Sequence, residues 1–329
     1  MAEIDLVCPW VDGSDPAWQA ERNRYASAEE QKQTLMWRDW GLMRYWFRGV
    51  ERALPWIRKV HFVTWGHLPA WLNTEHPKLH VVRHDAYLPK EYLPTFSGGP
   101  IALNVHRIEG LAEQFIYAND DYFFIDRLEK EEFFQKGLPC DFLQVQPITE
   151  IGASNYGYIL WNNISCLNEY LNLSECLKQN EALWFHPAYP SSIRKFNEIA
   201  RHLKYFPGFA HPHLPQAMLK STYEEVWKKA RPRLHFASKQ KFRSWSCNSD
   251  LLMRDWQLAT GKFTPYMRRG KYIALDAPKE ELKKALLSTK HPIVCLNEGE
   301  KEVDFLSRRS YVQALFQRVL PEKSAFEKD

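Results

Sequence analysis

Residues 115–124, with the sequence FIYANDDYFF, combine a strand signal with two adjacent acidic residues. The first three residues are apolar, aromatic or β-branched, which indicates a short buried strand. Asp120 and Asp121 follow at its end, where two buried carboxylates without a partner would repel each other. A divalent cation such as Mg²⁺ or Mn²⁺ would compensate them, because it prefers oxygen ligands. A strand-ending turn explains the same residues, so this stretch alone leaves both interpretations open.

The first half of the chain repeats strands and helices around this stretch. We expect strands at 4–10, 60–65, 79–82, 115–117 and 142–146, and helices at 28–54, 101–111 and 129–136. Such alternation is typical of an α/β fold with helices packed on a sheet. Residues 1–150 are therefore predicted to form an α/β nucleotide-binding half.

The second half, residues 151–329, is predicted to be mainly helical and to complete the same domain. We expect helices at 164–179, 191–203, 214–230, 250–260 and 310–320, and short strands at 272–274 and 293–296. The tail 322–329 is rich in charged residues, and we expect it to fray.

Polar loops of the first half are candidates for a ligand site. Asp12, Gly13 and Asp15 follow the first expected strand, and open α/β sheets bind ligands beyond the carboxyl ends of their strands. The two carboxylates could hold a ribose, a base or a metal. The alternative is that they cap the next helix, which is favoured more for Asp15 than for Asp12.

Two further features of the first half could contact phosphate. The loop 93–100 carries Thr95, Ser97 and a Gly-Gly pair before an expected helix, whose free backbone amides can receive a phosphate. Arg44 and the arginines four and eight residues after it share one helix face. A solvated helix face is the commoner explanation for such a stripe.

Two histidines of the second half are candidates for proton transfer. His211 and His213 lie beside prolines directly before the helix expected at 214–230. A helix N-terminus disfavours the cationic imidazole, so a neutral ring would remain to accept a proton from a hydroxyl group. A structural capping role is the commoner explanation for an isolated histidine. Arg243 lies in a basic stretch further along the chain.

Composition limits the class of protein and its compartment. The 329 residues carry a net charge of +4 with both signs interspersed, which gives no field of the size that nucleic-acid binding needs. The aromatic share of 14% suits sugar stacking or a membrane-facing rim, although such rings more often fill a core. The six cysteines lack a C-x-x-C pair, and neither a signal peptide nor a long apolar run is present. We therefore expect a cytoplasmic protein, or one bound peripherally at the inner membrane face.

Four blocks of the sequence resemble the Stealth family, whose members are sugar-1-phosphate transferases of bacterial capsule synthesis and lysosomal-enzyme tagging. The first block is Ile4–Val7 with Trp10–Trp18. The second runs from Arg38 to Phe124 and includes Arg44-Tyr45, Leu93-Pro94-Thr95-Phe96, His106-Arg107-Ile108 and Asn119-Asp120-Asp121. The third resembles His213-Leu214-Pro215 through Phe242-Arg243 to Asp250, and the fourth is Ile293–Glu298. Together the blocks span nearly the whole chain.

The resemblance implies a GT-A-like, Rossmann-type core and transfer of a hexose-1-phosphate from a UDP-sugar to an acceptor hydroxyl, with release of UMP. It also implies Mg²⁺ or Mn²⁺, and an acceptor that is a glycan or a lipid-linked oligosaccharide. The residues that it implies for catalysis are His213 near the attacked phosphate, Arg243 on its oxygens, and Asp121. The implied metal ligands are Asp120, Asp121, Asn297 and Glu298. The implied substrate-binding residues are Asp12, Gly13, Asp15, Arg44, Thr95, Ser97, His106 and Arg107.

Three features depart from the family pattern. Ala102 stands where many members have Glu, and Glu298 stands where the fourth block normally has Asp. The spacing between Arg243 and Asp250 is also longer than usual. These departures affect the placement of ligands rather than the reaction class.

Two other functions compete with this one. A metal-dependent nucleotide-sugar glycosyltransferase that releases UDP would use an Asp-Asp pair equally well. A non-catalytic glycan-binding protein would use its tryptophans to stack on sugars. The combination of His213 and Arg243 suits phosphoryl transfer better than either alternative.

Overall fold

Five strands form the main sheet of the protein. The computed structural model describes residues 3–32, 38–149, 155–299 and 303–328. The five strands are β1 (Ile4–Pro9), β2 (Val60–Thr64), β3 (Leu79–Arg83), β4 (Gln114–Tyr117) and β8 (Gln216–Leu219). Their order is β3-β2-β1-β4-β8, in which the first four run parallel and β8 runs antiparallel to β4. The 3-2-1-4 order is that of Rossmann-type sheets, so the predicted α/β fold class is confirmed.

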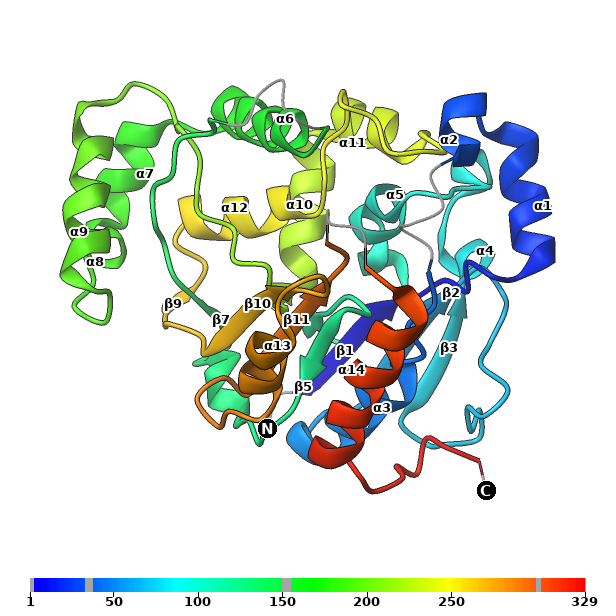
Figure 1. Ribbon diagram of the computed structural model, residues 1–329. Coiled ribbons are helices and arrows are strands. Elements are labelled where there is room, and N and C mark those ends of the chain that lie inside the picture. Colours follow the sequence, from blue (N-terminus) through cyan, green and yellow to red (C-terminus); the bar gives the residue numbers. More distant parts are fainter. Residues whose placement is uncertain (1–2, 33–37, 150–154, 300–302, 329) are drawn as a thin grey trace.

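Helices cover both faces of the main sheet, as Figure 1 shows. Along β1, Leu6 and Cys8 face one core and Val7 faces the other. The first core contains α3 (Met43–Ala53), α13 (Lys279–Leu286) and α14 (Phe305–Val319). The second contains α5 (Gly98–Leu103), α6 (Asn155–Tyr170), α10 (Lys220–Lys229), α11 (Arg231–Ser238) and α12 (Leu251–Ala259). Burial on both faces explains why the strands are rich in apolar residues, although Asp5 and His61 are buried polar exceptions.

Two small sheets extend the fold. One has the order β10-β11-β5 and consists of β5 (Tyr122–Phe124), β10 (Gly270–Ala274) and β11 (Ile293–Asn297). The other consists of β6 (Phe134–Gln135), β7 (Leu138–Asp141) and β9 (Thr264–Pro265). Because β5 begins directly after Asp121, that residue lies where the chain passes from the main sheet to the second one.

Short helices make up the rest of the regular structure. They are α1 (Pro16–Tyr25), α2 (Ala28–Lys32), α4 (His84–Tyr87), η2 (Lys90–Tyr92), η3 (Val105–Arg107), η4 (Lys130–Glu132), α7 (Leu173–Gln179), α8 (Glu181–Trp184), α9 (Ser191–Asn197) and η5 (Glu198–His202). In Figure 1, α7, α8 and α9 stand together at the left of the view, away from α1 and α2.

The helix predicted at 214–230 is wrong in its first part. Its first residues form β8, which pairs with β4, and α10 begins only at Lys220. The strand comes from the second half of the chain yet completes the sheet of the first half. β11 likewise pairs with β5. Both halves of the chain therefore build the same layers.

Three more predicted elements differ from the structure. The helix expected at 129–136 is only the short η4, followed by β6. The strand expected at 142–146 lies earlier, as β7, and of the expected range Val145 makes one isolated bridge to Phe209. The helix expected at 28–54 is divided into α2 and α3, and residues 33–37 within it lie outside the described residues. Long-range strand pairing, which periodicity does not report, accounts for the first two differences.

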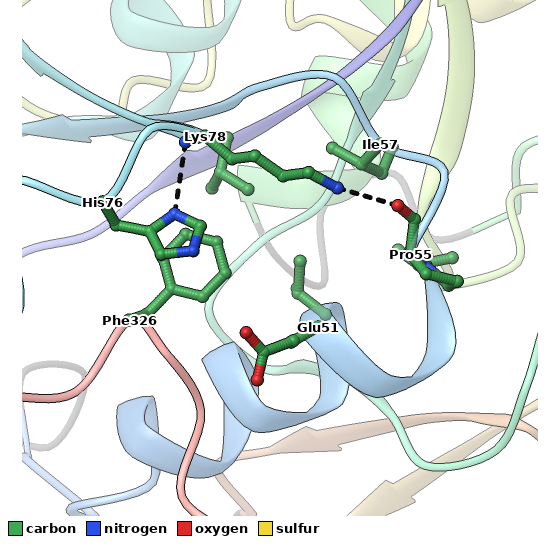
Figure 2. A pocket seen from close by; sticks show the side chains of 9 residues that line it. Glu51, Pro55, Ile57, His76, Lys78 and Phe326 are labelled. Atoms are coloured by element: carbon green, nitrogen blue, oxygen red, sulfur yellow. Dashed lines mark hydrogen bonds between the residues drawn. The ribbon is translucent and has the colours of Figure 1, made fainter.

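The charged tail does not fray, contrary to the prediction. Phe326 is only 2% exposed, and the Glu327 carboxylate accepts two hydrogen bonds from the Arg48 guanidinium, at 2.7 and 3.1 Å. Arg48 also donates to the backbone oxygen of Leu320 at 3.0 Å. Figure 2 shows Phe326 beside the His76 ring, at the edge of a small cavity of about 140 Å³ under α3.

The three arginines of the α3 stripe all have contacts within the protein. Besides Arg48, the Arg52 guanidinium donates to the backbone oxygen of Val319 at 2.7 Å. Arg44 lies over the Trp71 ring, 5.3 Å from its centroid. The contacts of Arg44 are thus cation–π packing, and the structure does not bring it to Asp120 and Asp121.

Removal of the Glu327 carboxylate should destabilise the protein. A Glu327→Ala variant leaves the buried Arg48 charge without its bidentate partner, which typically costs about 3 kcal/mol. Urea unfolding followed by circular dichroism measures this loss. Glu322→Ala, an exposed carboxylate of the same tail, is the matched control and should change stability little. Equal stabilities for the two variants would show that the Arg48–Glu327 pair does not anchor the tail.

Candidate active site

The Asp-Asp stretch forms a turn and also faces a cluster of polar groups. The Tyr122 backbone N–H donates to the Asn119 oxygen at 3.1 Å, so the turn interpretation is correct. The same turn brings the Asp121 Oδ2 atom within 3.7 Å of His213 Nε2 and within 3.6 Å of the Cys295 thiol. The other carboxylate oxygen, Oδ1, is buried and has no hydrogen-bond partner among the described residues. An unpaired buried oxygen calls for an explanation, and a cation-binding role is one that suits two adjacent carboxylates.

Burial makes both carboxylates hard to ionise. Desolvation and the neighbouring Asp120 charge raise the pKa of Asp121 to about 7. Desolvation also raises the pKa of Asp120 to about 6, with a smaller contribution from Asp39. The side chain of Asp120 is accessible to solvent, but protein surrounds its carboxyl group on most sides. Each raised pKa records a free-energy cost that a bound cation would remove.

His213 lies in the loop before β8 and not at a helix N-terminus, which corrects the prediction. Its ring stacks on Tyr272 at 5.6 Å and meets the edge of Tyr122 at 5.4 Å. Burial, followed by the positive charge of Arg243, lowers the pKa of His213 below its ordinary value. The predicted neutral imidazole therefore results from these two causes and not from a helix dipole. With 40% of its side chain exposed, the ring remains within reach of a substrate.

Buried polar contacts hold the loop that carries His213. The neighbouring His211 ring pairs with Asp255 at 2.7 Å, and the Arg254 guanidinium donates to the backbone oxygen of Ala210 at 2.8 Å. Arg268 donates to the backbone oxygen of Pro215 on the other side. His211 is thus committed to a structural contact, and His213 is the histidine that faces Asp121. Sequence reasoning missed both arginines because their partners are distant in the chain. These partners are the Asp141 carboxylate and the Ala210 oxygen for Arg254, and backbone oxygens for Arg268.

Arg243 lies on the same side of the molecule as His213. It is exposed, and its charge opposes protonation of both His213 and Asp250. Asp250 occupies the N-cap position of α12 without a capping hydrogen bond from its side chain. Burial raises the pKa of Asp250 to about 6. The structure therefore places His213 beside Asp121, and the charge of Arg243 acts on His213 and Asp250.

Asp12 and Asp15 form a second group, at the carboxyl end of β1. The Asp12 carboxylate accepts from the Ser14 backbone N–H at 2.9 Å, and the Asp15 carboxylate accepts from that of Ala17 at 2.8 Å. Asp15 thus caps α1, as the alternative interpretation predicted. Its other oxygen contacts His67 Nδ1 at 3.0 Å, and the Asp12 backbone N–H donates to His67 Nε2 at 2.7 Å. The sequence analysis missed His67, although its position just after β2 could have indicated it.

Gly13 of this loop is buried, and its carbonyl accepts from the Gln19 side chain at 2.7 Å. It contributes backbone geometry to the Asp12 loop rather than a free polar group.

The hydroxyl groups of Thr95 and Ser97 form hydrogen bonds within the protein. Thr95 is 1% exposed, and its hydroxyl donates to the backbone oxygen of Gln240 at 3.3 Å. Ser97 caps α5 by accepting from the backbone N–H of Gly99 at 3.4 Å. The phosphate site expected at the start of the six-residue α5 stays a prediction. Thr95 supports the segment that leads to Arg243.

His106 and Arg107 pack on α10 and do not contact the Asp121 cluster. His106 is buried beside Tyr223, and desolvation lowers its pKa to about 3. The Arg107 guanidinium lies over the Trp227 ring, 4.8 Å from its centroid. The contacts of both residues are therefore those of packing residues.

In the fourth block, Cys295 rather than Glu298 is the candidate metal ligand that lies beside Asp121. Glu298 accepts a hydrogen bond from the Trp40 indole at 2.8 Å and lies 3.8 Å from Arg38. Cys295 takes the place beside Asp121, and burial followed by the Asp121 charge raises the pKa of its thiol. Asn297 lies two residues further along β11, on the same strand face as Cys295.

The donor set fits a divalent cation. Asp121, His213 and Cys295 each offer one ligand atom, and these atoms lie within 4.8 Å of one another. The carboxylate oxygen suits Mg²⁺ or Mn²⁺, whereas the imidazole and thiol extend the set toward softer ions. The unpaired Oδ1 atom of Asp121 adds a free oxygen at the same place.

Among the described residues, the helices are all too short or too polar to cross a membrane.

Comparison with known proteins gives the family of the chain. The models of Stealth conserved regions 1 and 2 match residues 3–30 and 36–140. A capsular polysaccharide phosphotransferase (WcwK) of Streptococcus pneumoniae is 35% identical, with 99% of both chains covered. A receptor polysaccharide phosphotransferase (WefC) of Streptococcus oralis is 34% identical, covering 99% of this chain and 100% of the relative. An exopolysaccharide phosphotransferase (cps2G) of Lactiplantibacillus plantarum is 31% identical, covering 99% and 96%.

A solved structure, mouse xyloside xylosyltransferase 1 in its apo form, aligns with 89% of this chain and 97% of its own, with a TM-score of 0.35 and 12% identity. This similarity is too weak to add to what the strand order shows. The full-length relatives and the two matched regions are decisive: the chain belongs to the Stealth family.

Proposed function

We propose that the protein is a polysaccharide phosphotransferase that moves a hexose-1-phosphate from a UDP-sugar to a glycan hydroxyl and releases UMP. The donor would be a UDP-hexose or a UDP-N-acetylhexosamine. The observation that carries the proposal is the approach of His213 to Asp121 at 3.7 Å, beside the charge of Arg243. The names of the full-length relatives support the phosphotransferase class.

In the proposed reaction, the acceptor hydroxyl oxygen attacks the phosphorus atom that carries the sugar. A new P–O bond forms to the acceptor while the bridging P–O bond to UMP breaks, and UMP leaves with the bridging oxygen. The hydroxyl proton passes to His213, which can accept it because its pKa lies below the ordinary value. Arg243 donates hydrogen bonds to the phosphoryl oxygens, where negative charge is concentrated.

Asp120 and Asp121 are the residues that would hold a divalent cation, with Cys295 and Asn297 on the adjacent strand as further donors. Such a cation, when bound, supplies positive charge toward the diphosphate. Asp121 would be the direct ligand, because its buried Oδ1 atom has no other partner among the described residues. His213, although near enough to be a ligand, would stay uncoordinated in this arrangement and accept the proton.

The Asp12 loop would receive the nucleotide. Asp12 and Asp15 lie beyond the carboxyl end of β1, next to β4 and its Asp-Asp turn. Ligands of open α/β sheets bind where neighbouring strands diverge in this way. His67, which links the two residues, would fix the shape of that loop.

The nucleotide product distinguishes this proposal from a glycosyltransferase. The protein is incubated with a UDP-sugar, Mn²⁺ and candidate glycans, and the nucleotides are separated by chromatography. UMP together with a new phosphodiester signal in the ³¹P NMR spectrum is the expected result. UDP together with a glycosidic product would overturn the proposal and support the glycosyltransferase alternative.

Arg243 should be sensitive even to replacement by lysine. The planar guanidinium binds two phosphate oxygens at once, which an ammonium group does not. We expect Arg243→Ala to lower kcat roughly 10²–10³-fold and Arg243→Lys to recover only part of that loss. Arg231→Lys, on the exposed start of α11, is the matched control. Wild-type turnover in Arg243→Lys would exclude a bidentate role.

A further inference from the structure

A cavity of about 460 Å³ is lined by Arg243 of the candidate active site, and its other lining residues have no part in the proposed reaction. It lies between the loop 239–245, Glu30 of α2 and Asn155 at the start of α6. Its volume is in the range of small-ligand sites. Arg243 lines the cavity and also acts on His213 and Asp250, so the cavity and the catalytic group share this residue.

The charges that line the cavity favour an anion. Lys239, Lys241 and Arg243 contribute three positive charges, against one carboxylate, that of Glu30. Lys239 is 3.3 Å from Glu91, which does not line the cavity. The Lys241 ammonium group donates to the backbone oxygens of Leu93 and Pro94 at 3.4 and 3.3 Å. These contacts fix the positions of the lysines. Glu91 offsets part of the Lys239 charge, and Lys241 and Arg243 keep the lining net positive against Glu30.

The basic loop is anchored firmly on its inner side. The Phe96 backbone N–H donates to the Lys241 oxygen at 2.8 Å, and the Phe96 and Phe242 rings stack at 5.5 Å. The Thr95 hydroxyl bonds the adjacent Gln240 oxygen. The loop therefore presents its charges from a fixed backbone, which reduces the ordering cost of binding.

An aromatic platform stands at the outer side of the same cavity. Trp245 lines it and is 61% exposed, which is unusual for so large an apolar ring. Its ring meets the edge of Tyr158 at 5.9 Å, and the Asn162 side chain donates to its backbone oxygen at 2.8 Å. The indole is thus held in place but uncovered. An exposed, fixed indole suits the apolar face of a sugar ring.

We propose that this cavity binds the acceptor, and that the acceptor is a glycan which itself carries a phosphodiester. Trp245 would stack on a sugar ring, and Lys239 would pair with the negative charge while Arg243 orients the chain end toward His213. This inference rests on the proposed function, because a transferase of this kind makes a phosphodiester in each round. A growing chain of such repeats would return to the site as an anionic acceptor.

Binding measurements without turnover test the inference. The probes are two synthetic oligosaccharides that differ only in one methyl phosphodiester, titrated into the full chain by calorimetry. We expect the charged probe to bind about fivefold more tightly than the neutral one. Lys239→Gln should remove that preference, and added salt should weaken it in the wild type. Trp245→Ala should weaken both probes about fivefold.

Matched controls separate this site from the donor site. Trp161→Ala removes a different exposed indole, which belongs to α6, and Lys228→Gln removes an exposed charge of α10. Both variants should bind the probes as the wild type does. UDP-sugar affinity should be unchanged in Trp245→Ala and Lys239→Gln. Loss of UDP-sugar binding in these variants, or equal binding of the two probes by the wild type, would overturn the inference. The identity of the released nucleotide is measured separately, so failure of the proposed function is distinguishable from failure of this site.

Discussion

A His213→Ala variant is expected to lose transfer by a factor of about 10²–10⁴ while it binds a UDP-sugar as tightly as the wild type. His213 is the described histidine that faces Asp121, and its ring lies between Tyr122 and Tyr272. Removal of the ring eliminates the proton acceptor but leaves the Asp12 loop intact. Initial-rate measurements give kcat, and calorimetry gives the affinity for the donor.

The matched control is His202→Ala, an exposed histidine of η5, which should retain full turnover. Near wild-type kcat in His213→Ala would disprove the base assignment. A parallel loss of donor affinity would instead place His213 in substrate binding.

The pH dependence of the same reaction gives an independent check. Burial and the Arg243 charge lower the pKa of His213, so the wild type should keep its full rate through neutral pH and lose it only below pH 6.5. In Arg243→Ala the cation is gone and the pKa of His213 should rise. The acidic limb of the rate profile should then move to higher pH, in addition to the loss of kcat. An unmoved limb would mean that another group takes the proton.

An Asp121→Asn variant is expected to abolish transfer and yet to be more stable than the wild type when no metal is present. Burial and Asp120 raise the pKa of Asp121 to about 7, above the ordinary value of 3.8. The ionised Asp121 carboxylate therefore lowers the free energy of unfolding at alkaline pH by on the order of 2–4 kcal/mol. The amide has no charge to desolvate, so the melting temperature at pH 8 should rise by several degrees.

The pH and metal dependence of this gain identify its cause. As the pH falls through 7, wild-type Asp121 takes up a proton in the folded state, so the stability difference should shrink and vanish near pH 4. Mn²⁺ should stabilise the wild type by mass action and the variant much less. Asp126→Asn, a nearby carboxylate, is the control. Unchanged metal response and unchanged turnover in Asp121→Asn would disprove the assignment of Asp121 as a metal ligand.

Local sequence signals predicted the parts of the fold that local chemistry determines. β1, β2 and β4 are short apolar runs ended by polar residues, and the structure places all three in the main sheet. β8 escaped prediction because its pairing with β4 connects residues about a hundred positions apart. The same limit applies to Cys295, whose contact with Asp121 exists only because β11 pairs with β5.

Family motifs include residues that approach one another in the structure and residues that only pack. His213 lies 3.7 Å from Asp121, and the Arg243 charge acts on His213. Thr95 and His106 belong to the same blocks, but the structure buries them as supports for a loop and for α10. A motif preserves residues that position a site as well as residues that touch a substrate, and only three-dimensional contacts distinguish the two.

The buried pair of Arg48 and Glu327 has a consequence for how the protein is made. Ribosomes synthesise Arg48 early and Glu327 nearly three hundred residues later, so the nascent chain carries an unmatched charge on α3 throughout. The apolar surface that Phe326 covers also stays open during that time. A polypeptide interrupted before these residues would keep both defects, which are what cellular chaperones and proteases detect. Packing of α3 is therefore complete only after residues 326 and 327 have been made.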